Sequence, residues 1–74
     1  MNKETLGRIE GNRDAILYED PSINSEEFMF LTPGTEVLVI DPNSADDFYH
    51  VFTPIGLEGW ILKDYVEIVL EGGN

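Results

Sequence analysis

The sequence predicts an all-β fold, a small barrel or sandwich of short antiparallel strands. Strand-prone segments of four to six residues recur along the chain, with glycine, proline and polar residues between them, a pattern typical of such folds. No stretch has the apolar spacing of an amphipathic helix. With 74 residues and a 42% hydrophobic composition, the chain has material for one domain with a compact core.

The N-terminal segment, residues 1–14, is mostly polar and contains two glycines, so the sequence predicts at most a short edge strand around Ile9. The barrel itself is expected to span residues 15–69, beginning with a strand at 15–18. Residues 19–27 are rich in turn formers and include a proline, which has no backbone donor for a ladder. We therefore expect a surface loop there.

Two further strands are predicted at 28–31 and 35–40, and the turn at 32–34 contains proline followed by glycine. A fourth predicted strand, 48–53, forms a hairpin with 35–40 across a polar loop at 41–47.

The strand at 35–40 is apolar on both faces. Val37 and Val39 share the face expected to fill the core, which leaves Leu38 and Ile40 on the other face. That outer face must be covered by a terminal segment, by a partner, or by nothing.

Two glycines and the single tryptophan mark the C-terminal part of the barrel. Gly56 belongs to a turn, and Gly59 directly before Trp60 is expected to let two strands pass closely without a Cβ between them. Lys63 and Asp64 should interrupt this strand and form a bend before the last one, 66–69. Residues 70–74 are the C-terminal tail, of which 71–74 are expected to fray. The residues predicted to point inward are Leu17, Leu31, Val37, Val39, Tyr49, Val51, Ile61, Val66 and Ile68.

With these strands placed, residues 15–69 resemble the bacterial SH3-like (SH3b) family. Four segments carry the resemblance: Asp20-Pro21-Ser22, Leu31-Thr32-Pro33-Gly34-Thr35-Glu36-Val37, Phe48-Tyr49-His50-Val51, and Gly56-x-x-Gly59-Trp60-Ile61 with Tyr65-Val66. The resemblance implies an SH3-like barrel of five to six short strands that acts as a binding module. Ile16 and Tyr18 stand where the family commonly has asparagine and arginine, and Phe48 stands where it commonly has tryptophan.

Four aromatic residues are the candidate ligand-binding residues: Tyr18, Phe48, Trp60 and Tyr65. Exposed aromatic rings beside a loop bind extended peptides in SH3-like barrels, because flat rings contact proline or backbone at little entropic cost. The alternative is that each ring belongs to the core, where aromatic side chains are often buried.

No catalytic residue, metal site or cofactor is predicted. His50 is the only histidine and no cysteine is present, so no nucleophile and base are paired in a recognised motif. The loop Asp41-x-Asn43-x-x-Asp46-Asp47 gathers oxygen ligands, but it lacks the glycine and distant glutamate of an EF-hand. We therefore expect a protein that is not an enzyme.

Charge is the most unusual feature of the composition. The net charge is -11, and residues 14–58 contain ten acidic side chains and no lysine or arginine. Such a field repels nucleic acid and anionic lipid, so neither is an expected partner. The field can serve solubility alone, or it can favour a basic partner.

Three functions remain open at this point. The first is a monomeric binding module for a protein or peptide partner, and the negative charge favours a basic partner. The second is a peptidoglycan-binding module of a secreted protein. The third is an acidic inhibitor or DNA mimic, of the kind that a small phage protein could be, acting on a basic nucleic-acid-binding protein. The first residues contain Lys3, Glu4 and Arg8 without an apolar signal segment. The expected location is therefore the cytoplasm, or the cell wall if the chain belongs to a larger secreted protein.

Overall fold

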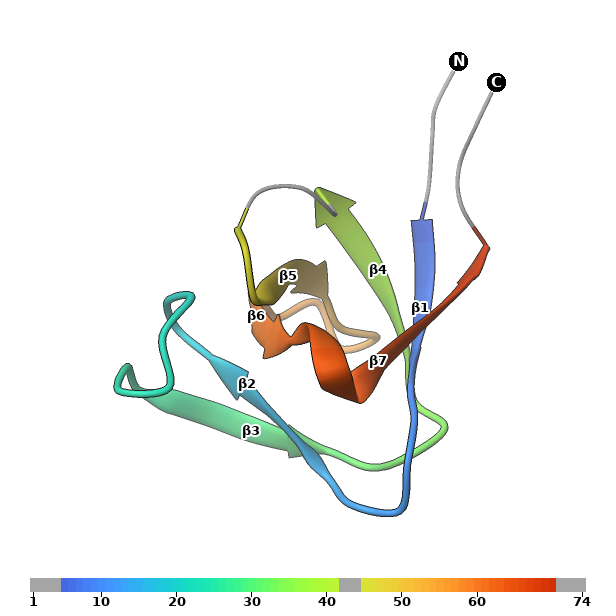
Figure 1. The fold of residues 1–74 in the computed structure, drawn as a ribbon, viewed down its shortest axis with the longest axis horizontal. Helices are drawn as coiled ribbons and strands as arrows, with labels where there is room; N and C mark the ends of the chain where they lie inside the picture. Colours follow the sequence, from blue (N-terminus) through green and yellow to red (C-terminus); the bar gives the residue numbers. More distant parts are fainter. Residues whose placement is uncertain (1–4, 42–44, 71–74) are drawn as a thin grey trace.

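The computed structural model describes residues 5–41 and 45–70 and is all-β (Figure 1). Its seven strands form one sheet in the order β3-β2-β6-β5-β4-β1-β7, in which every pair of neighbours is antiparallel. The strands are β1 (Thr5–Ile9), β2 (Ala15–Tyr18), β3 (Glu27–Leu31), β4 (Glu36–Asp41), β5 (Phe48–Phe52), β6 (Glu58–Leu62) and β7 (Val66–Leu70). A single 3-10 turn, η1 (Lys63–Tyr65), joins β6 to β7. The predicted fold class is confirmed.

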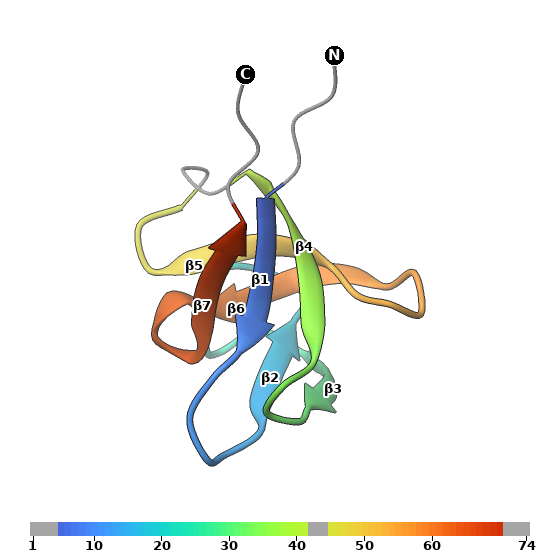
Figure 2. The ribbon, with the colours of Figure 1, turned by 90° about the vertical axis from the view of Figure 1, so that its right-hand side faces the viewer.

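The sheet folds back on itself around one core. Figure 2 shows β7, β1 and β4 side by side, with β5 and β6 running across behind them. Seven of the nine residues predicted to point inward are buried in this core, while Tyr49 and Ile68 are partly buried against it. Ile9 and Ala15 complete the buried cluster. Burial of these aliphatic side chains supplies the main driving force for folding.

The N-terminal strand β1 is not the edge strand that the sequence predicts. It lies between β4 and β7 and pairs with both. Gly7, near its centre, is buried, and a Cβ there would lie 2.7 Å from Cγ1 of Val66 and 3.2 Å from Cγ2 of Val39. The glycine that weakens the strand signal in the sequence is therefore required by close packing. β1 also raises the number of strands to seven, above the five to six expected.

The predicted turns and the close strand crossing are present. Gly34 and Gly56 both have positive φ, 93° and 86°, a conformation that suits glycine. In the turn between β5 and β6, the hydroxyl of Thr53 accepts a hydrogen bond of 3.0 Å from the amide of Leu57. At the crossing, a Cβ on Gly59 would lie 2.7 Å from the carbonyl oxygen of Tyr18.

The outer face of β4 is apolar and exposed. Val37 and Val39 are buried as predicted, whereas Leu38 and Ile40 are 41% and 50% exposed. Among the residues that the structure describes, nothing covers this outer face. The predicted fraying of the tail concerns 71–74, which lie outside the described residues.

Within the described ranges, no helix is long and apolar enough to cross a membrane.

Candidate functional site

The candidate site lies on the outer face of β2, β6 and β5, which are neighbours in the sheet. Side chains alternate between the two faces of a strand, and the inward positions of β6 are Gly59 and Ile61, both buried. Trp60 and Leu62 therefore point outward, where Tyr18 is paired with Trp60 and Phe48 with Leu62. Three of the four predicted aromatic residues thus share one face.

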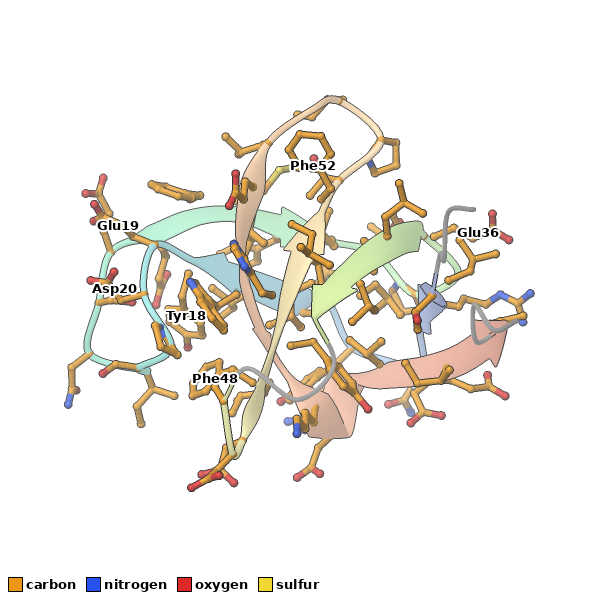
Figure 3. The ribbon with its side chains drawn as sticks, turned by 90° about the horizontal axis from the view of Figure 1, so that it is seen from above. Tyr18, Glu19, Asp20, Glu36, Phe48 and Phe52 are labelled. Carbon is orange, nitrogen blue, oxygen red and sulfur yellow. The ribbon has the colours of Figure 1, made fainter. Side chains whose placement is uncertain are left out.

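Tyr18 and Phe48 are not the exposed rings that the sequence analysis expects. They are only 6% and 7% exposed, although they project from the outer face. Their rings meet edge to face, with centroids 6.0 Å apart and planes at 83°, and Figure 3 shows them next to each other. An edge-to-face pair of this kind is a stabilising arrangement of aromatic rings. These two residues form the floor of the site. Both rings are buried, as the core alternative in the sequence analysis has it. Their role in ligand binding stays a prediction.

Trp60 is partly exposed and held from one side. The imidazole of His50 stacks on its indole with ring centroids 4.3 Å apart and planes at 7°. Nε2 of His50 lies 2.7 Å from a carboxylate oxygen of Glu58, so the imidazole is fixed by two contacts. The stack leaves the indole pre-oriented, which lowers the entropic cost of using it as a contact surface.

Tyr65, in η1, lies at one end of the site. It lines a small pocket of about 60 Å³ together with Tyr18 and Leu62, next to Asp14 and Ile16. The guanidinium of Arg13 lies 5.5 Å from the centroid of the Tyr65 ring and donates a hydrogen bond of 3.1 Å to its hydroxyl. This cation–π contact and the hydrogen bond fix the ring from its outer side.

A second hollow extends the site. It has a volume of about 450 Å³, and its lining includes Ile23, Phe48, Leu62 and Lys63. Because Leu62 lines both hollows, they adjoin each other. We call the set Tyr18, Phe48, Trp60, Leu62 and Tyr65 the outer aromatic surface.

Carboxylates border this surface. Asp46 and Asp47 are exposed and line the larger hollow, and Asp14 lines the smaller one. Glu19 and Asp20 follow Tyr18 directly and are exposed (Figure 3).

Among the described residues, two cations beside the outer aromatic surface lie over rings. Arg13 covers Tyr65, and Nζ of Lys63 lies 5.2 Å from the centroid of the Tyr49 ring. The surface therefore combines an apolar floor, partly exposed rings and an acidic rim. This combination suits an extended ligand that carries apolar and positively charged groups.

Ser22, Ser25 and His50 do not form a nucleophile–base pair. The hydroxyls of Ser22 and Ser25 form their hydrogen bonds within the loop between β2 and β3, whereas His50 is bonded to Glu58. No three His, Asp or Glu side chains of the described ranges lie close enough together to hold a metal ion. Residues 42–44 of the loop considered for calcium, Asn43 among them, lie outside the described residues.

Three contributors to the site are not among the ligand-binding residues predicted from the sequence: Leu62, His50 and Arg13. Alternation along β6 places residues 58, 60 and 62 on one face and so could have identified Leu62. The other two depend on contacts between distant segments, because Arg13 and Tyr65 are 52 residues apart and His50 reaches Trp60 only through the pairing of β5 with β6.

Comparison with known proteins gives one family. A model described as Bacterial SH3 domain matches residues 13–67, which includes β2 to η1, the start of β7 and the whole outer aromatic surface. Strand β1 lies outside the matched range. Neither the curated proteins nor the solved structures gave a match.

Proposed function

Because the chain belongs to the bacterial SH3 domain family, whose members are binding modules, we propose that it binds an extended, basic segment of a partner protein without catalysing a reaction. The outer aromatic surface is the proposed contact. The observation that carries this proposal is the pairing of a prealigned, partly exposed Trp60 with a buried Tyr18–Phe48 floor. Rigid aromatic side chains over a packed base are typical of residues that contribute most of the binding energy.

The acidic rim supports the basic character of the ligand. Asp46 and Asp47 are exposed along the hollow that Phe48 and Leu62 line, while both nearby cations contact tyrosine rings. A lysine or arginine of the partner that approaches this rim gains favourable charge interactions, and apolar groups of the same segment can contact Trp60.

The test is capture of partners by the immobilised protein from a cell lysate and, in parallel, its binding to purified peptidoglycan. We expect the Trp60→Ala variant to lose the captured protein, with a loss of affinity of about 2 kcal/mol or more if Trp60 is a hot spot. Phe52→Ala is the matched control, because Phe52 is an exposed aromatic residue at the end of β5 and lines neither hollow of this surface. Normal capture by a folded Trp60→Ala variant would contradict the proposal.

Peptidoglycan is the second candidate ligand, and family membership favours it. The same surface would then contact the stem peptides or sugars of the wall. Retention on purified peptidoglycan that depends on Trp60, with no protein captured from lysate, would replace the first proposal by this one.

The net charge favours a third candidate, an inhibitor that imitates nucleic acid. With ten acidic residues between positions 14 and 58, the protein could occupy a nucleic-acid-binding protein through charge alone. Capture of such a protein by both the parent and Trp60→Ala, abolished by salt, would support this function.

A further inference from the structure

β3 is an open edge of the sheet. Its strand partner is β2 alone, and it stands at the end of the strand order (Figure 1). Within the described ranges, no backbone hydrogen bond other than those of the β2 ladder involves Glu27–Leu31. Alternate residues of an edge strand direct unpaired N–H and C=O groups outward, so β3 presents such groups to solvent.

Beyond Glu27, the side chains of this edge are apolar, although an isolated protein usually places charges along an open edge. Phe28 and Phe30 are 39% and 57% exposed. Edge strands are commonly protected by lysine, proline or short length, whereas β3 has five residues and neither lysine nor proline. The opposite edge, β7, carries the exposed Glu67 beside Val69.

A hollow of about 260 Å³ lies along β3. Met29, Phe30 and Leu31 line one side of it. The remaining lining comes from the two neighbouring turns: Thr32, Thr35, Thr53, Pro54 and Ile55. Ile55 is the most exposed large hydrophobic residue of the described ranges, at 75%. An unpaired edge and an apolar hollow therefore adjoin each other on β3.

We propose that the β3 edge accepts an extended segment of a partner protein, which adds to the sheet as an eighth strand. Backbone hydrogen bonds to β3 would hold the segment, and its alternate apolar side chains would contact Phe28, Phe30 and the hollow beside Ile55. Strand addition of this kind takes affinity from the main chain and specificity from alternate side chains. This site borders the outer aromatic surface, because Glu27 pairs with Tyr18, but its hollow is lined by none of the residues of that surface. It does not depend on the proposed function.

The charge around β3 defines the occupant. Glu26 and Glu27 are exposed at its N-terminal end. The segment should therefore combine alternating apolar residues with lysine or arginine. A second copy of the chain is disfavoured because each copy carries a net charge of -11 and like charges oppose association.

The experiment uses a short synthetic peptide of alternating lysine and valine as the probe. Binding to the isotopically labelled protein is followed by NMR, together with amide hydrogen exchange. We expect chemical-shift changes and slowed exchange centred on Glu27–Leu31, because new hydrogen bonds protect outward-facing amides. Perturbations centred instead on β7 or on the outer aromatic surface would overturn the proposal.

Three comparisons separate strand addition from charge attraction. A fully N-methylated peptide of the same sequence keeps the charge and side chains but cannot donate backbone hydrogen bonds. Its affinity should therefore be lower by at least about tenfold. Phe30→Ser should lower the affinity of the protein for the unmethylated peptide by about tenfold. Val69→Ser, on the opposite edge, should leave this affinity unchanged. Equal binding of the two peptides would show that charge alone drives association and would overturn the proposal.

The Trp60→Ala variant distinguishes this site from the proposed function. It should bind the lysine–valine peptide as the parent protein does, because Trp60 lies on β6 and does not line the hollow beside β3. Loss of peptide binding in Trp60→Ala with retention in Phe30→Ser would assign the peptide to the outer aromatic surface and refute the β3 site.

Discussion

Gly59 passes so close to Tyr18 that a Cβ atom at position 59 would lie 2.7 Å from the Tyr18 carbonyl oxygen. The same atom would also lie 2.8 Å from Cγ of Leu17. A backbone oxygen in a paired strand cannot move aside without disturbing the ladder. We therefore expect Gly59→Val to destabilise the protein by about 1–3 kcal/mol or more, measured by urea or thermal unfolding.

Gly7→Ala is the matched comparison for the Gly59 prediction. Its nearest obstacles are the methyl groups of Val66 and Val39, which belong to side chains and can adjust more readily. Gly59→Ala should therefore cost more stability than Gly7→Ala, and the reverse order would contradict the role assigned to the crossing.

The second prediction concerns β1, which lies outside the range matched by the family. Ile9 is only 1% exposed and belongs to the core cluster, and β1 is the strand partner of β7. Ile9→Ala should therefore reduce the free energy of unfolding by about 2–5 kcal/mol. Ile23→Ala, at a site 61% exposed, is the control and should stay within about 0.5 kcal/mol. An equally small effect at both positions would show that the barrel is complete without β1.

The β4 strand shows what alternation alone can predict. Its period of two places Val37 and Val39 in the core and Leu38 and Ile40 outside, as the structure confirms. The pattern is sufficient because a strand that lines a core buries every second residue. The hairpin of β4 with β5 follows from the same local signals.

The burial of Tyr18 and Phe48 could not be predicted in this way. Both occupy outward positions of their strands, yet each is covered, in part by the ring of the other. Their strands, β2 and β5, are separated in the sheet by β6. Local sequence does not specify a contact across an intervening strand, so the sequence could not decide between exposure and burial for these two rings.

The third prediction follows from that burial. Tyr18→Ala should lower stability by about 3–5 kcal/mol, the usual cost of removing a buried aromatic side chain, rather than act on ligand binding alone. Tyr18→Phe keeps the ring pair with Phe48 and removes only the hydroxyl, so it should cost much less. Urea unfolding of both variants gives the comparison, and a fully stable Tyr18→Ala would show that the ring is dispensable to the fold.

The last prediction concerns the acidic rim of the outer aromatic surface. Asp46 and Asp47 are exposed beside the hollow that contains Phe48, so they should speed the approach of a basic partner. Exposed charges are screened beyond about 8 Å at physiological salt, and the association rate should therefore fall as salt is added. The double variant Asp46→Asn, Asp47→Asn should show a slower association rate at low salt and a weaker dependence on salt.

Glu67→Gln, which removes one exposed charge on β7, is the control and should change the rate less. Stopped-flow measurements with the captured partner test this prediction. A rate that is insensitive to salt and to both sets of substitutions, combined with loss of binding in Trp60→Ala, would mean that the rings alone recognise the partner and that the negative charge serves solubility.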